Sequence, residues 1–160
     1  MGEGTTTLRA ETAMTTRPDP IATVTSGTLA AIGALHVVWG LRAGRPATDR
    51  GRRMAEAVSG AGRSPSPAAC YAVAGLLATA AALVAGQPAP WPRLRLAGQT
   101  GVAAVLGARG LLGVIGRTDL VAPGQVTPQM RRWDRLLYTP LAIALAAGAA
   151  HSARRTARSS

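Results

Sequence analysis

Four apolar blocks divide this sequence, and nearly all of its charged residues lie between them. The blocks comprise residues 21–41, 68–86, 96–116 and 136–151. A helix needs roughly 20 apolar residues to cross a hydrocarbon core about 30 Å thick. The first and third blocks reach that length, the second nearly does, and the fourth is shorter. The pattern predicts an all-α fold, an integral membrane four-helix bundle with antiparallel, up-and-down topology.

The chain is short enough for a single domain, and the blocks set its limits. We expect a four-span domain over residues 21–151. Residues 1–20 are polar and acidic without an apolar stretch, which predicts a disordered N-terminal tail and no cleavable signal peptide. Met14 leads directly into the first block, so the start is expected either there or at Met1. Residues 152–160 are predicted to form a basic C-terminal tail.

The aromatic residues give independent support for a membrane. There is no phenylalanine, and every tryptophan and tyrosine lies near the edge of a block. These residues are Trp39, Tyr71, Trp91, Trp133 and Tyr138. Indole and phenol rings prefer the headgroup level, where the ring is half buried and its polar atom stays hydrated. A soluble bundle would instead place some aromatic side chains in the middle of its helices.

The positive charge is large but dispersed. All 18 basic residues are arginine, and the formal net charge is +11. Arginines that are spread over loops and tails argue against nucleic acid as a partner. They fit membrane flanks that attract anionic headgroups, so we expect the lipid bilayer as the partner, with a membrane-protein partner or a homo-oligomer left open. The arginine count slightly favours loops 42–67 and 117–135 as cytoplasmic.

Residue usage also indicates the source of the chain. The absence of lysine beside abundant alanine and glycine is typical of a GC-rich bacterial genome. We therefore expect a multi-pass protein of the bacterial inner membrane. The alternative class is a soluble, Arg-rich helical bundle that binds nucleic acid through its loops, and extraction from membranes without detergent would establish it.

The third block is unusually rich in glycine. Its glycines recur at multiples of three positions, at Gly98, Gly101, Gly107, Gly110, Gly113 and Gly116. Small residues let helices approach closely in lipid, where packing drives association. A three-residue step drifts around a helix of 3.6 residues per turn. The spacing predicts a central helix that touches more than one neighbour.

Prolines mark two boundaries. The proline-rich connection 87–93 predicts a tight antiparallel hairpin between the second and third blocks. At the fourth block, Thr139 fits the N-cap of a helix with Pro140 at its first position. Alternatively, the helix begins near Arg131 and contains Pro140, which the length needed to cross a membrane favours.

Topology places five polar or aromatic residues in one leaflet. Arg109 is the only charged residue of the third block, and His36 and Trp39 lie at the matching end of the first. Asp134 and Tyr138 open the fourth block at the same side. An arginine inside a membrane should face the bundle or a partner. We expect Asp134 to be its counter-ion, either as a structural latch between helices or as part of a binding site.

No recognised catalytic or cofactor motif is present. Cys70 is the single cysteine, so no intrachain disulfide forms. His36 and His151 lie at opposite ends of the predicted bundle, which excludes one haem iron between them. No metal-ligand spacing, P-loop, nucleophile elbow or dinucleotide fingerprint occurs. We expect no cofactor and a non-enzymatic transport, sensing or accessory subunit. The alternative is a membrane enzyme or redox-partner subunit that uses His36 as a proton carrier.

Segments 35–41, 109–113 and 132–141 together resemble the bacterial domain-of-unknown-function 3995 family of small membrane proteins. The residues that match its pattern are His36, Trp39, Arg109, Gly113, Asp134, Tyr138, Pro140 and Leu141. The likeness extends over about residues 22–150, and Gly40 departs mildly from the usual residue after the tryptophan. The resemblance implies a four-helix integral membrane protein and carries no assigned activity.

Overall fold

The computed structural model describes residues 19–43, 66–86, 91–120 and 127–159. Its long helices are α1 Pro20–Arg42, α3 Pro67–Ala85, α4 Pro92–Val114 and α6 Thr139–Arg158. The shorter elements are the 3₁₀ helix η2 Thr118–Leu120, helix α5 Pro128–Trp133 and the π-helical turn η3 Asp134–Tyr138. The described residues contain helices and turns but no strand, so the predicted all-α class is confirmed.

Proline and a capping side chain define where most of these helices begin. Pro20, Pro67 and Pro128 each open a helix, a position where the missing N–H costs nothing. Asp19 precedes Pro20 and accepts a hydrogen bond from the backbone N–H of Ile21 at 3.0 Å. Ser66 and Thr127 cap α3 and α5 in the same manner.

Three helical segments are long and apolar enough to cross a membrane. They are α1, α3 and the continuous segment Pro128–Arg158, which comprises α5, η3 and α6. Helix α4 is not among them, although the sequence pattern predicted a full span over residues 96–116. The part of α4 that follows Arg93 and Arg95 still contains Gln99, Arg109 and several glycines, which lower its mean hydropathy.

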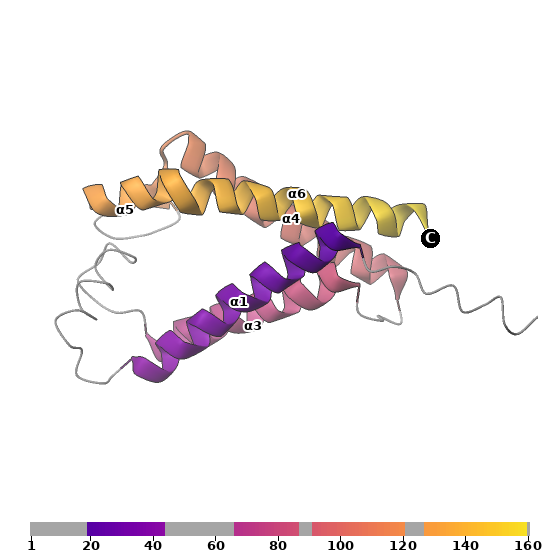
Figure 1. The fold of residues 1–160 in the computed structure, drawn as a ribbon, viewed down its shortest axis with the longest axis horizontal. Coiled ribbons are helices and arrows are strands. Elements are labelled where there is room, and N and C mark those ends of the chain that lie inside the picture. Colours follow the sequence, from indigo (N-terminus) through magenta and orange to yellow (C-terminus); the bar gives the residue numbers. More distant parts are fainter. Residues whose placement is uncertain (1–18, 44–65, 87–90, 121–126, 160) are drawn as a thin grey trace, which may run out of the picture.

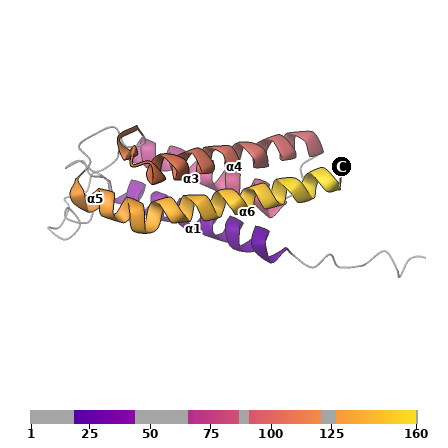
Figure 2. The same cartoon turned by 90° about the horizontal axis from the view of Figure 1, so that it is seen from above.

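The long helices pack as two pairs (Figure 1). Helix α1 packs mainly against α3, and α4 packs mainly against α6, beside which it lies in Figure 2. Within the first pair, Gly40 near the end of α1 lies against Tyr71 near the start of α3. The pairs cross where α1 begins and diverge toward the end of α1, as Figure 1 shows. The four helices therefore share one end rather than packing together along their whole length.

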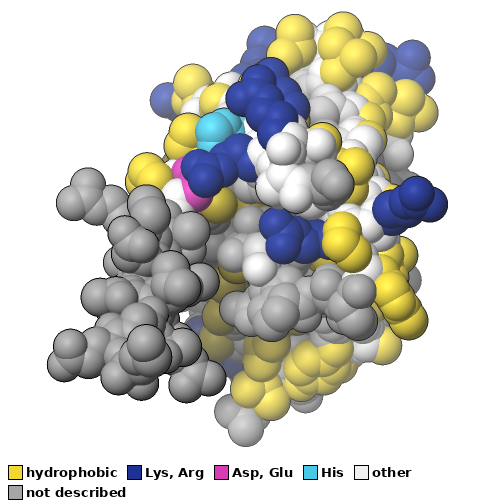
Figure 3. Space-filling model, turned by 90° about the vertical axis from the view of Figure 1, so that its right-hand side faces the viewer, with side chains coloured by type: hydrophobic (Ala, Val, Ile, Leu, Met, Phe, Trp, Pro, Cys, Tyr) yellow, Lys and Arg dark blue, Asp and Glu magenta, His cyan; other side chains and the backbone are white. Residues whose placement is uncertain are grey.

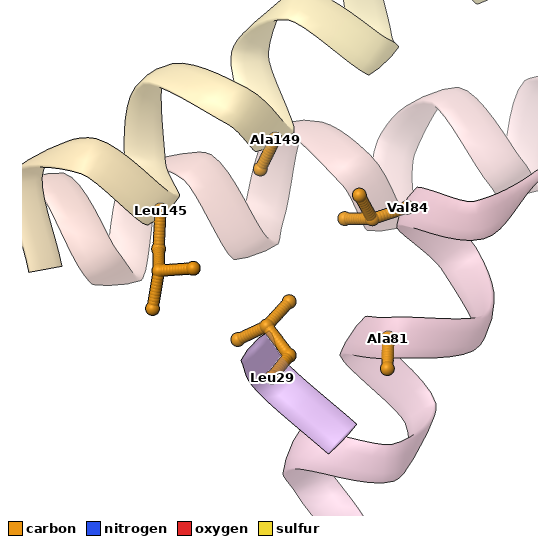
Figure 4. Packing of buried hydrophobic residues seen from close by; sticks show 5 residues of the cluster. All are labelled: Leu29, Ala81, Val84, Leu145 and Ala149. Atoms are coloured by element: carbon orange, nitrogen blue, oxygen red, sulfur yellow. The ribbon is translucent and has the colours of Figure 1, made fainter. Parts of the chain in front are cut away.

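The buried apolar core lies at this crossing. It consists of Leu29, Ala81, Val84, Leu145 and Ala149, drawn in Figure 4. Leu29 and Ala149 are both 0% exposed, and Thr25 of α1 lies against Gly148 of α6, so these two helices are in close contact here. Most of the remaining large apolar side chains face outward, as expected for helices whose surroundings are lipid rather than water.

The contact between α3 and α4 is limited. The side-chain amide of Gln99 on α4 donates to the backbone carbonyl of Leu83 on α3 at 2.8 Å. A Cβ atom added to Gly98 would lie 2.8 Å from the Leu83 side chain. Most of the packing of α3 is with α1 instead, so the predicted hairpin of the second and third blocks is close only near its connection.

Helix α6 continues to Arg158 and so includes most of residues 152–160, which were predicted to form a C-terminal tail. Tertiary contacts explain the difference, because Ser152 and Thr156 are buried. Arg95 of α4 donates a hydrogen bond to the hydroxyl of Thr156 at 3.0 Å. The predicted N-terminal tail lies almost wholly outside the described residues, as does most of loop 42–67.

Candidate functional site

Glycines bring the backbones of α4 and α6 together. A Cβ atom on Gly110 would lie 2.6 Å from Cγ1 of Ile143, and one on Gly107 would lie 3.9 Å from Ala146. A Cβ atom on Gly113 would overlap the hydroxyl of Thr139. Because Gly98 faces α3 instead, the prediction that this glycine-rich helix touches more than one neighbour is confirmed.

The close approach pairs the one charge in the middle of α4 with an acid on the opposite helical segment. The Nη2 atom of Arg109 donates a hydrogen bond to Oδ1 of Asp134. The Asp134 side chain is 1% exposed and that of Arg109 is 25% exposed. This is the counter-ion that the sequence pattern predicted. A buried carboxylate without such a partner would be strongly unfavourable.

Asp134 opens a π-helical turn that ends at Tyr138, two residues before Pro140. The backbone N–H of Thr139 donates to the carbonyl of Asp134, five residues earlier. Pro140 has no N–H and cannot continue the ordinary pattern, so the wider turn accommodates it. Since the helical segment continues from Pro128 to Arg158, the alternative in which the helix contains Pro140 is confirmed. Single π-helical turns inside α-helices are frequent at functional sites.

Two polar atoms beside this pair are buried without a hydrogen-bond partner among the described residues. They are Nη1 of Arg109 and the hydroxyl oxygen of Thr139. A buried polar group left without a partner costs about 1–3 kcal/mol, and such groups are few in native proteins. A guanidinium N–H and a hydroxyl are suited to oxygen atoms of a carboxylate or phosphate.

The five residues predicted to form one cluster fall into two sets. Arg109 and Asp134 are in contact, and Tyr138 closes the same π-helical turn, partly buried. His36 and Trp39 lie on α1, with ring centroids 5.1 Å apart. This end of α1 lies away from α5 because the helix pairs diverge (Figure 1).

The ring of His36 is held by its own helix. Its Nδ1 atom is 2.8 Å from the backbone carbonyl of Ile32, one turn earlier. No described contact joins it to Arg109 or Asp134, so the structure offers no specific support for His36 as a proton carrier at the ion pair.

A second polar set, at the opposite end of the molecule, was missed by the sequence analysis. Asp19 accepts from Arg155 at 3.0 Å and lies 2.9 Å from Nε2 of His151. Basic side chains gather around this end, which Figure 3 shows. The available signal was the four-residue spacing of His151 and Arg155, which places both on one face of a helix. It was overlooked because Asp19 and Arg155 were both assigned to tails.

Acid is expected to weaken the contact at Asp19. Burial acts to raise the pKa of this carboxyl, but hydrogen bonds from His151 and from two backbone N–H groups outweigh it and lower the pKa below its ordinary 3.8. A lowered pKa means that the stabilisation is present above about pH 4 and is lost as the pH falls through the folded-state value. The measurement is thermal unfolding against pH, with Asp19→Asn for comparison. Identical acid sensitivity of the two proteins would contradict the expectation.

Metal binding has no candidate in the part of the chain that the structure describes. No group of three or more His, Cys, Asp or Glu side chains occurs there. Cys70, at the start of α3, is a free cysteine that is buried at 2% exposure.

Comparison with known proteins gives one match. A family model described as "Protein of unknown function (DUF3995)" matches residues 29–149. No curated protein and no solved structure matches the chain. The matched range includes the whole of the ion pair, the π-helical turn and the glycine-rich face of α4.

Proposed function

Because this chain belongs to the DUF3995 family of proteins of unknown function, we propose its role from its own residues. It is a non-enzymatic, multi-pass protein of the bacterial inner membrane that serves in transport, sensing or as an accessory subunit. Its binding centre is Arg109, together with Thr139, at the π-helical turn between α4 and α6. The group bound there carries carboxylate or phosphate oxygens.

The membrane setting is supported by composition and by exposure. Three helical segments are long and apolar enough to span, and large apolar side chains such as Leu76, at 72% exposure, face outward. Helix α4 is proposed to cross the membrane as well, because α6 packs along it and Asp134 pairs with Arg109, the charged residue at its centre. In that setting an unpaired Arg109 would cost on the order of 3 kcal/mol.

The observation that carries the proposal is the pair of unsatisfied atoms beside the ion pair. A purely structural latch would need only the contact between Arg109 and Asp134. In addition, Nη1 of Arg109 and the hydroxyl of Thr139 are buried without a hydrogen-bond partner in the described structure. Valine would fill the position of Thr139 without an unsatisfied hydroxyl, so the presence of threonine favours a bound group.

Thr139→Val separates the site from the latch, because it leaves the ion pair intact. We expect the variant to reach wild-type abundance in the membrane, with equal or higher thermal stability, since an unsatisfied buried hydroxyl is removed. In a deletion strain, under a growth condition that impairs it, the variant should fail to complement. Arg109→Gln should also fail, whereas Arg93→Gln, an exposed arginine on the same helix, should complement fully.

Abundance and complementation must be read together in this experiment. Full complementation by Thr139→Val would overturn the binding centre and leave the ion pair as a structural latch. Loss of folded protein in Arg109→Gln is expected from the latch alone, so that variant by itself does not decide the matter.

A further inference from the structure

The segment that carries Asp134 has a second, outward-facing feature. Arg131, Arg132 and Arg135 line a shallow hollow of about 480 Å³, together with Pro128 and Leu136. All five residues are exposed, whereas Asp134 between them is buried. The helix therefore presents its acid inward to α4 and three arginines outward.

The acids that the structure describes near this end are already engaged. Asp134 pairs with Arg109, and Asp119 pairs with Arg117 at 3.2 Å. None of the three arginines of the hollow has an ion pair among the described residues. Like charges within little more than one helical turn repel each other, so the hollow favours an anionic occupant.

The surroundings of the hollow are those of a membrane rim. It lies at the N-terminal end of Pro128–Arg158, a segment able to cross a membrane. Trp133, at 42% exposure, is next to it, and tryptophan favours the headgroup level. Leu136, at 65% exposure, provides an apolar wall on the side toward the rest of the span. An occupant with a phosphate and an acyl chain fits both the arginines of the hollow and its apolar wall.

We propose that this hollow binds an anionic phospholipid, with its phosphate among Arg131, Arg132 and Arg135 and its acyl chain along Leu136. The inference rests on the proposed membrane placement but not on any ligand at Arg109. The two sites lie on opposite sides of one helical segment. Each arginine near an anionic headgroup contributes roughly fivefold in affinity, so removal of all three should weaken binding on the order of 100-fold.

The test uses the full chain purified in detergent micelles and titrated with phosphatidylglycerol or phosphatidylcholine. Thermal unfolding of the wild type should shift upward with phosphatidylglycerol only. In the triple variant Arg131→Gln, Arg132→Gln, Arg135→Gln the phosphatidylglycerol needed for half of the shift should rise on the order of 100-fold. The matched control is Arg93→Gln, Arg154→Gln, Arg158→Gln, which removes three exposed arginines from the opposite end and should behave as wild type.

Each other outcome overturns the inference in a distinct way. If both triple variants need equally more phosphatidylglycerol for half of the shift, the lipid responds to the total positive charge of the protein and not to the hollow. An equal shift with inorganic phosphate excludes the lipid, and an equal shift with a short DNA duplex indicates nucleic acid instead. Should the triple variant fold poorly, the three single variants replace it, each with an expected loss of roughly fivefold. Absence of a phosphatidylglycerol shift in the wild type would overturn the lipid site alone, whereas full complementation by Thr139→Val would overturn the Arg109 site alone, so the two proposals fail separately.

Discussion

Asp134→Asn should destabilise the protein by about 3 kcal/mol, the largest effect expected of any conservative change in this chain. The substitution removes the charge that pairs with Arg109 in the described structure, while nearly preserving shape. Because the Asp134 side chain is 1% exposed, the carboxylate that contacts the guanidinium is shielded from bulk water, which strengthens the interaction that the substitution removes. The measurement is the free energy of unfolding in detergent micelles, from denaturant titration followed by circular dichroism.

The double variant Arg109→Gln, Asp134→Asn gives the decisive comparison. It replaces the ion pair with a neutral hydrogen-bonded pair, so it should be within about 1 kcal/mol of wild type although each single change is costly. Asp119→Asn is the matched control, because Asp119 forms an exposed pair with Arg117 and should lose less than about 1 kcal/mol. If Asp134→Asn cost no more than this control, the buried pair would have no special role.

Gly113→Ala should destabilise the protein by about 1–3 kcal/mol through overpacking. The added Cβ atom would lie 2.9 Å from Cβ of Thr139 and closer still to its hydroxyl. Because Cβ is fixed to the backbone, helices α4 and α6 must move apart, which also lengthens the contact of Arg109 with Asp134. Unfolding in micelles measures the loss of stability.

Gly101→Ala on the same helix is the control for this change. A Cβ atom at Gly101 would meet nothing within 4 Å, so only helix propensity acts there. Alanine is favoured over glycine by up to about 1 kcal/mol in a helix, and the control should be neutral or stabilising. Equal destabilisation by both substitutions would mean that the interface between α4 and α6 is not tightly packed.

The ion pair was accessible from the sequence because charge inside an apolar block is scarce. Arg109 is the single charged residue of its block, and counting residues from the block ends placed Asp134 at a similar depth. The glycine spacing of α4 likewise predicted close neighbours. These features depend on local spacing along a helix, which a sequence pattern records directly.

The grouping of His36 and Trp39 with the ion pair was not predictable in the same way. Counting residues along helices gives depth in a membrane but not lateral position. Helix pairs joined by small residues in lipid have little apolar driving force to close along their whole length. The crossing and divergence of the helix pairs in Figure 1 depend on where the pairs touch. One such contact is that of Thr25 with Gly148, which the periodicity of the sequence does not predict.

The continuation of α6 to Arg158 could not be predicted for a different reason. Arg154, Arg155 and Arg158 give this stretch the composition of a solvated tail. However, Ser152 and Thr156 continue the buried face of α6 at four-residue spacing. Polar residues on a buried face are recognised only once their partners, here Arg95 for Thr156, are known.

Of the four proposed spans, α4 has the composition that supports a membrane position least. Val105 is 71% exposed on the face away from α6 and is therefore expected to face lipid. In a Cys70→Ala background, a cysteine introduced by Val105→Cys is treated with a membrane-impermeant maleimide in intact and in opened vesicles, beside the control Ser159→Cys. We predict that position 105 stays unlabelled in both until detergent is added, while position 159 is labelled in at least one. Labelling at 105 without detergent, at a rate similar to that at 159, would contradict the membrane placement of α4 and of Arg109.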